Sequence, residues 1–202
     1  WAADSGSLRV TIPPTDFLAP AIQPTSIWYI PVEDQPARLI GEVTTHSGLN
    51  RPPFFAPDFS RLAYLVGDQP ENRPESNQLG IGISEMSESK IWDPVVYEAE
   101  IMNTFGWSPD GLRFLVTIPT TGVAEIVMGQ PGIEPLLAGQ NSNVFNLTWI
   151  DNDRFLFEQH NEDDWHLFLG YADRGESAFI DSGVHGPGSY DFIWVPADTA
   201  DN

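Results

Sequence analysis

The sequence predicts an all-β protein assembled from copies of one small antiparallel sheet, and two observations support this. The first is a recurring hairpin, written most fully as GWSPDGLRFLV at 106–116, in which an aromatic residue precedes a tight turn and an apolar run follows it. The second is that no segment longer than a turn shows the 3.6-residue periodicity of an amphipathic helix. We therefore expect strands and turns along all 202 residues.

The turn inside this hairpin has a residue suited to each of its positions. In Ser108-Pro109-Asp110-Gly111, proline presets φ, aspartate can accept a bond from the backbone ahead, and glycine adopts a left-handed conformation. A strand that ends near Trp107 is therefore expected to pair with a second strand over 112–118.

The same hairpin recurs along the chain. Related stretches are FFAPDFSRLAYLV (54–66), LTWIDNDRFLFEQ (147–159), WAADSGSLRVTI (1–12) and, up to its turn, YDFIWVPAD (190–198). The aromatic anchors are Trp1, Phe55, Trp107, Trp149 and Trp194, with spacings of 54, 52, 42 and 45 residues. Such spacings are typical of four-stranded propeller blades.

Two copies depart from the turn pattern. Phe59 stands where the third copy has its glycine, and a bulky residue there is strained by about 1 kcal/mol or more, so we expect a different turn. Asn152 and Asp153 replace Pro-Asp-Gly in the fourth copy, and both residue types tolerate left-handed geometry.

Each hairpin is followed by two further strands. Third strands are expected at 26–32, 79–86, 124–129 and 166–172, and fourth strands at 37–42, 90–97, 134–139 and 177–183. The predicted fold is an all-β β-propeller of about four four-stranded antiparallel blades in a single domain, 1–202, with blades at about 1–45, 46–98, 99–140 and 141–183. A C-terminal strand at 190–196 is expected to complete the first blade. The alternatives are a section of a larger propeller and a half-ring completed by a second copy.

These residues resemble a known repeat. WSPDG with its apolar strand, and the strand-turn-strand IWYIPVEDQPARLIG, are similar to the TolB-type, WD40-like propeller repeat, which also occurs in propellers of prolyl oligopeptidase-like peptidases. The resemblance covers essentially the whole chain in four copies. It implies a propeller fold and a periplasmic or cell-surface module for protein interaction, while its motif is structural and specifies no activity.

Composition limits the partners. Acidic residues outnumber basic ones 29 to 9, for a net charge of −20, which disfavours nucleic acid and anionic membranes and favours a protein partner with a basic surface. No stretch approaches eighteen consecutive apolar residues, so we expect no membrane insertion. Because the chain opens with Trp1 and has no basic-then-apolar leader, we expect any export signal to have been removed. Cysteine is absent, so neither disulfides nor thiolate chemistry are expected.

Catalytic motifs are missing. The nearest string to a G-x-S-x-G elbow, GISEM at 82–86, lacks the final glycine and lies in an expected strand. Asp151 and Asp153 are interpreted as turn formers rather than an acid–base pair, and GIGIS at 80–84 lacks a phosphate-binding pattern. We therefore predict no catalytic residues, no cofactor and no enzyme activity. The alternatives are the substrate-gating propeller of a larger hydrolase and a glycan-binding propeller.

The longest loops are expected on one face. The second-to-third turns at 13–24, 67–78 and 158–166 and the links at 45–53 and 182–190 share it, and loops held by a rigid scaffold commonly bind partners. The candidate binding residues are Asp16, Phe17, His46, Glu71, Asn72, His160, Glu162, Asp163, Asp164, Trp165 and His185.

The stretch HNEDDWH at 160–166 raises the question of a metal site. His160, Glu162, Asp163, Asp164 and His166 have side chains that ligate divalent cations. However, residues on the two sides of a tight turn often point to opposite faces, and the spacing matches neither an EF-hand nor HExxH. We therefore expect a solvated acidic turn with Trp165 packed inward, and no metal. The predicted function is a non-catalytic scaffold whose loop face binds a protein.

Overall fold

The computed structural model describes residues 6–13, 22–33, 35–46, 53–67, 79–101, 103–119, 122–137, 144–161 and 164–183. These residues form strands, bends and turns, with no helix among them, and hence none long and apolar enough to span a membrane. The predicted all-β class is confirmed.

The strands form four antiparallel sheets in chain order. The first contains β1 (Ser7–Ile12), β2 (Ile22–Pro31) and β3 (Arg38–His46), and the second β4 (Phe54–Phe55), β5 (Arg61–Gly67), β6 (Leu79–Glu85) and β7 (Val95–Glu98). The third contains β8 (Asn103–Trp107), β9 (Arg113–Ile118), β10 (Gly122–Val127) and β11 (Glu134–Pro135). The fourth contains β12 (Val144–Trp149), β13 (Arg154–Asn161), β14 (Asp164–Tyr171) and β15 (Glu176–Gly183).

The first sheet has three strands within the described residues, and they correspond to the second, third and fourth strands of the other sheets. The segment 190–196, expected to complete this sheet, lies outside the described residues. In the fourth sheet, β13 reaches Asn161 and pairs it with Asp164. The prediction that 158–166 is a turn is therefore wrong for most of its length, because the hairpin continues nearly to its tip.

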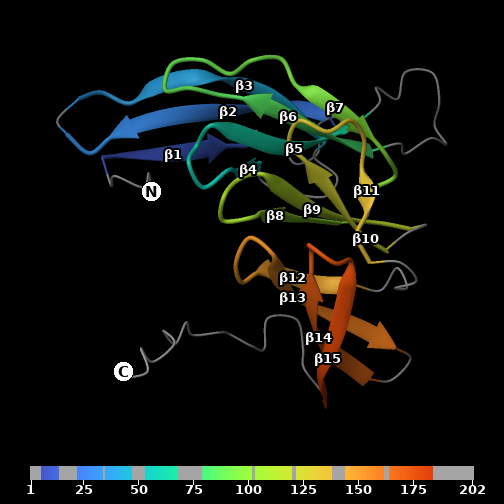
Figure 1. Cartoon of the computed structure of the whole chain (residues 1–202). Coiled ribbons are helices and arrows are strands. Elements are labelled where there is room, and N and C mark those ends of the chain that lie inside the picture. The colour runs from blue at the N-terminus through green and yellow to red at the C-terminus, as the bar shows by residue number, and fades with distance from the viewer. Residues whose placement is uncertain are drawn as a thin grey trace, which may run out of the picture.

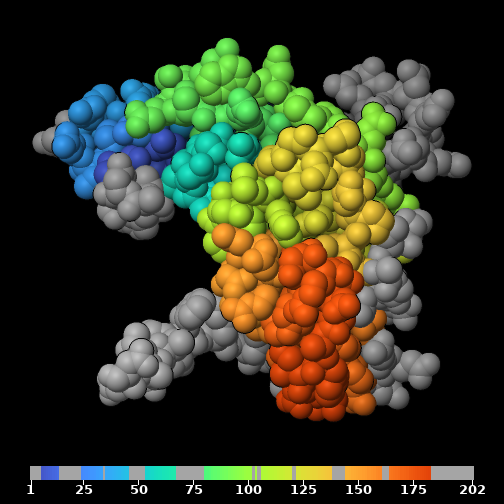
Figure 2. All heavy atoms as spheres, viewed as in Figure 1, coloured from blue at the N-terminus to red at the C-terminus, as the bar shows by residue number. Residues whose placement is uncertain are grey.

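The sheets follow one another along an open arc, with the first and fourth sheets apart at its ends (Figure 1). First strands of successive sheets contact each other, β4 with β8 and β8 with β12. Figure 2 shows the same order on the surface, with the fourth sheet meeting the third at one end of the arc.

The sheets pack face to face because alternate residues of each second strand face opposite neighbours. Leu62, Phe114 and Phe155 each follow the recurring arginine of their hairpin, and each is buried against the preceding sheet. The next residues along two of these strands, Ala63 and Leu115, are buried against the following sheet. Three apolar layers therefore lie between four sheets.

The turns correct two expectations. Phe59 adopts the left-handed conformation, φ 56°, like Gly111 at 70°, so the predicted different turn at Phe59 is wrong. Its N–H donates to the Ala56 carbonyl at 2.9 Å, as Gly111 N–H does to Ser108 at 2.8 Å. The Phe59 ring packs edge-on against Phe55, with 5.6 Å between ring centroids, which offsets part of the backbone strain.

In the fourth sheet the left-handed residue is missing from the turn. Neither Asn152 nor Asp153 has a positive φ. The Asp151 carboxylate instead accepts backbone N–H bonds from Asp153 at 3.0 Å and Arg154 at 2.8 Å. An aspartate at the start of a turn can thus replace the glycine-based geometry.

Candidate binding site

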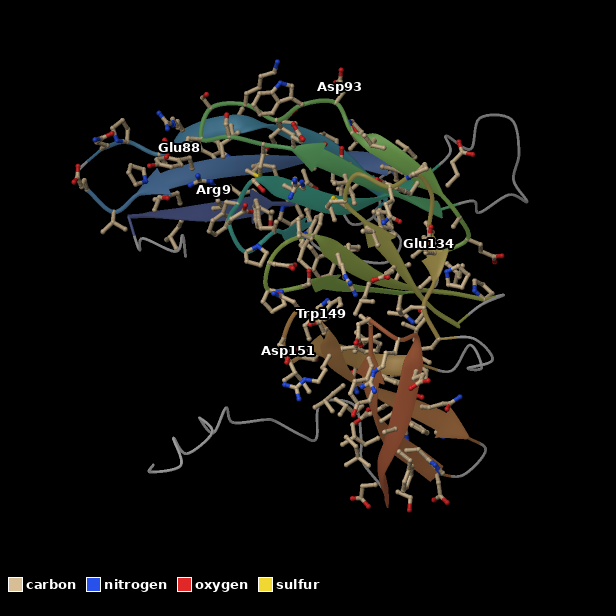
Figure 3. The ribbon with its side chains drawn as sticks, viewed as in Figure 1. Arg9, Glu88, Asp93, Glu134, Trp149 and Asp151 are labelled. Carbon is tan, nitrogen blue, oxygen red and sulfur yellow. The ribbon has the colours of Figure 1, made fainter. Side chains whose placement is uncertain are left out.

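Each sheet has a turn side, where its first-to-second and third-to-fourth turns lie, and an opposite loop side. Every described lysine and arginine lies in or beside a turn-side segment: Arg9, Arg38, Arg61, Lys90, Arg113, Arg154 and Arg174. Figure 3 shows Arg9 and Glu88 at this side of the first two sheets, and Trp149 and Asp151 at that of the fourth. Described positive charge is therefore confined to one side of the molecule.

These basic groups already have partners. Ion pairs join Arg38 to Glu88 at 3.0 Å, Arg113 to Glu125 at 3.8 Å and Arg174 to Asp173 at 3.6 Å, and Arg154 pairs with Asp151. The Arg9 guanidinium lies over the Tyr29 ring at 4.4 Å, and Lys90 lies 5.3 Å from the Trp92 ring. The turn side is thus internally neutralised to a large extent.

Tryptophans link successive sheets on the same side. Trp107 Nε1 donates to the Phe54 carbonyl at 3.0 Å, and Trp149 Nε1 donates to the Gly106 carbonyl at 3.2 Å. Each acceptor immediately precedes the aromatic anchor of the sheet before. The anchors therefore connect the sheets by hydrogen bonds as well as by burial.

The outer face of the fourth sheet, away from the third, has a different character. Phe155 and Phe157 of β13 face the third sheet, so their neighbours Leu156, Glu158 and His160 face outward. Strand register places Phe145 of β12 opposite Glu158, and Trp165 of β14 opposite His160. Trp165 packs on His160 at 4.7 Å and edge-on to Phe145 at 5.2 Å between ring centroids.

These outward side chains form a cluster at the loop side, which we call the Glu158 cluster: Phe145, Asn146, Glu158, His160 and Trp165. Phe145 is 37% exposed, whereas Glu158 is 0% exposed. Asn146 Nδ2 donates to Glu158 Oε2 at 2.6 Å, while Glu158 Oε1 is buried with no hydrogen-bond partner. A buried carboxyl oxygen without a donor is costly, so such a group in a native fold calls for a ligand or a mechanistic reason.

The backbone is irregular beside this carboxyl. The register of β12 shifts between Phe145 and Thr148, and Asn146 has a positive φ of 49°. Bulges and left-handed non-glycine residues are enriched next to functional sites, where they redirect a side chain. Here the irregular segment contains the residue that donates to Glu158.

Of the predicted binding residues, three have described side chains or strand positions in this cluster or beside it: His160, Asp164 and Trp165. Asp164 is exposed at the start of β14, and Trp165 is half-buried on the outer face. His46 ends β3 in the first sheet, far along the arc from the fourth (Figure 1). The remainder lie outside the described residues: Asp16, Phe17, Glu71, Asn72, Glu162, Asp163 and His185.

The two histidines of the stretch 160–166, where a metal site was considered and not predicted, face opposite ways. His166 pairs with Gln159 across the strands, on the face that contains Phe157 and Phe168, whereas His160 is on the outer face. No group of three or more His, Asp or Glu residues close enough to hold a metal occurs in the part of the chain that the structure describes. Phe54 packs against the core and edge-on to Phe114.

Glu125 offers a contrast with Glu158. It lies on the face of the third sheet that meets the fourth, is 9% exposed, and has an Oε2 that accepts no hydrogen bond although the Arg113 guanidinium lies 3.8 Å away. Burial raises the pKa of Glu125, and the attraction of Arg113 reverses only part of that shift. Of these two buried carboxyls, Glu125 faces the apolar layer between the third and fourth sheets, whereas Glu158 faces away from it.

Sequence reasoning did not identify Phe145, Asn146 or Glu158. The available signal was a carboxylate in the apolar run FLFE at 155–158, an unusual position for an acid. Its significance depended on the bulge, which has no clear sequence signature.

Comparison with known proteins identifies the fold. No protein-family model matches the sequence, and no curated protein matches it. The structure is similar to TolB from Acinetobacter baumannii, with a TM-score of 0.54 and 14% identity, over 89% of this chain and 41% of TolB. It also matches acylaminoacyl peptidase in complex with Z-Gly-Gly-Phe-chloromethyl ketone, with a TM-score of 0.46 and 14% identity, over 78% of this chain and 28% of the peptidase.

The chain therefore has the fold of a TolB-type β-propeller, as its repeats predict. It spans less than half the length of either similar structure. At 14% identity the similarity establishes the fold and no activity.

Proposed function

We propose that this protein is a non-catalytic propeller module that binds a protein partner through its loop side, with exposed arginine or lysine side chains of the partner making the main contacts. The observation that carries the proposal is the distribution of charge. All described basic residues lie at the turn side, where six of the seven meet acidic or aromatic groups of the chain itself and Arg61 donates to the Gly111 carbonyl at 3.4 Å. Within the described residues, Glu98, Glu100 and Asp164 of the loop side form no ion pair with a basic residue.

A rigid scaffold suits this role. Apolar layers join the four sheets, and tryptophan hydrogen bonds join the second to the third and the third to the fourth. A scaffold of this kind loses less conformational entropy when a partner binds. With a net charge of −20, the chain should attract a basic partner over a distance and bind it less tightly as salt rises. A periplasmic or cell-surface location is part of the proposal and is consistent with the TolB-like fold.

Site-specific photocrosslinking tests the proposal. A benzophenone side chain placed at the exposed position 164 on the loop side is compared with one at the exposed position 153 on the turn side. We expect position 164 to capture a protein from native extract, with the crosslink beside lysine or arginine and the yield falling at high ionic strength. Equal capture from both positions would refute a loop-side partner, and a salt-independent yield would refute a basic one.

A further inference from the structure

The Glu158 cluster has a specific unmet requirement. Glu158 Oε1 is buried without a donor, whereas Oε2 is bonded to Asn146. Guanidinium and ammonium groups satisfy such an oxygen best, because a charge-assisted hydrogen bond is about twice as strong as a neutral one. From this geometry we propose that the outer face of the fourth sheet binds one arginine or lysine side chain of a protein partner, with Glu158 as its counter-charge.

The neighbours of Glu158 suit the same ligand. Phe145 and Trp165 are in edge-on contact, Trp165 also contacts His160, and Phe145 lies opposite Glu158 across the strands, so aromatic rings lie beside the carboxyl. Aromatic faces attract cations and also pack on the aliphatic stem of a long basic side chain. Phe145 is 37% exposed and lies opposite Glu158 across the strands, so we expect an incoming side chain to displace its ring.

Within the described residues, no lysine or arginine lies beside Glu158. The seven described basic residues lie at the turn side, and the other two, Arg51 and Arg73, lie outside the described residues. The C-terminal stretch 184–202 contains neither lysine nor arginine. None of the described basic residues therefore supplies the counter-charge, and we assign that role to a basic side chain of a partner.

This inference rests on the proposed function and specifies the partner group at its binding site. The probe is a capped pentapeptide with one central arginine, compared with the same peptide containing citrulline, which keeps the shape and lacks the charge. The readout is the Trp165 indole N–H signal in NMR, assigned with a Trp165→Phe variant. We expect a saturable shift with the arginine peptide and at least about tenfold weaker binding of the citrulline peptide.

Glu158→Gln tests the counter-charge, because it keeps the size of the side chain and an oxygen that can accept from Asn146. We expect it to weaken arginine-peptide binding at least about fivefold. The matched control is Glu125→Gln. It removes another buried carboxyl that has one oxygen without a hydrogen-bond partner, but this carboxyl lies between two sheets. The control should leave peptide binding unchanged. Circular dichroism of both variants verifies the fold.

Three results would overturn the inference: no saturable shift, equal binding of both peptides, or equal affinity in Glu158→Gln and the unaltered protein. A Trp165 signal that shifts with protein concentration alone would also overturn it, because the occupant would then be a second copy. If crosslinking from position 164 still captures a basic protein, the proposed function stands and only the role of Glu158 fails. If both fail, the loop-side function fails with it.

Discussion

The two faces of the fourth sheet are built from alternate residues of the same strands, yet they differ in almost every respect. The inner face buries Phe155 and Phe157 against the third sheet. The outer face has an unpartnered carboxyl, a bulged strand and a partly exposed aromatic cluster. Packing between sheets explains the first face completely. The second retains features that reduce stability, as is common where a protein binds a ligand.

The largest expected effect is on the inner face, at Gly170. A Cβ on Gly170 would overlap the ring of Phe155, which is fully buried and cannot move aside. Gly170→Ala should therefore lower the free energy of unfolding by about 3 kcal/mol, measured by urea denaturation. Gly41→Ala is the control, because its Cβ would meet Ile91 at an ordinary 3.4 Å, and it should change stability by less than about 0.5 kcal/mol. Equal losses of stability in Gly170→Ala and Gly41→Ala would mean that the inner face is loosely packed.

The edge of the inner face is tested at Trp149. Trp149→Phe keeps an aromatic ring and removes the N–H that donates to the Gly106 carbonyl. The free energy of unfolding should therefore fall by about 1.5 kcal/mol. Trp107→Phe removes the equivalent bond to Phe54 and should cost a similar amount. Phe55 already occupies the corresponding position in the second sheet without such a bond. Unchanged thermal midpoints in both variants would show that burial alone joins the sheets.

Glu125 distinguishes a tolerated buried acid from the proposed functional one. Because burial raises its pKa in the folded state above the ordinary 4.5, the native protein binds this proton more tightly than the unfolded chain does. The stability associated with this group is therefore present below pH 4.5 and is lost as pH rises through the raised pKa. Glu125→Gln should stabilise the protein by about 1 kcal/mol at neutral pH and by less in acid. A destabilised variant at neutral pH would mean that the Arg113 pair outweighs burial.

The sequence predicted the inner face far better than the outer one. The repeated aromatic anchor, turn and apolar run are local signals, and they predicted four sheets in order. The Glu158 cluster depends on a register shift between Phe145 and Thr148, which arises from how two strands fit and not from the residue types of either. Sequence reasoning reached Trp165 and His160 only because they flank an acidic hairpin tip.

The turn that contains Asp151 in the fourth sheet contributes less to stability, and its contribution depends on pH. The hydrogen bond from the Arg154 side chain, joined by backbone N–H bonds, holds the pKa of Asp151 below its ordinary 3.8. A lowered pKa means that the stabilisation is present above pH 3.8 and disappears as pH falls through the lowered value. Asp151→Ala should cost about 0.5 kcal/mol at neutral pH, decreasing in acid. Asp153→Ala, on the same turn, is the control, because the backbone N–H groups of this turn donate to the Asp151 carboxylate.

The smallest net effect is expected at Phe59, where two opposing contributions nearly cancel. The left-handed backbone costs about 1 kcal/mol with a phenylalanine. The ring recovers a similar amount by packing on Phe55 and by lying 5.3 Å from the Arg9 guanidinium. Phe59→Gly removes both contributions and should change the free energy of unfolding by less than about 0.5 kcal/mol.

Phe59→Ala separates the two contributions, because alanine keeps the backbone cost and loses the ring. It should be about 1 kcal/mol less stable than Phe59→Gly in urea denaturation, as expected for a left-handed position. If the two variants are equally stable, the turn relaxes when the ring is removed. The left-handed geometry of the second sheet would then be imposed by Phe55 and Arg9 rather than by the turn itself, and the resemblance between this turn and that of Gly111 would be a consequence of packing.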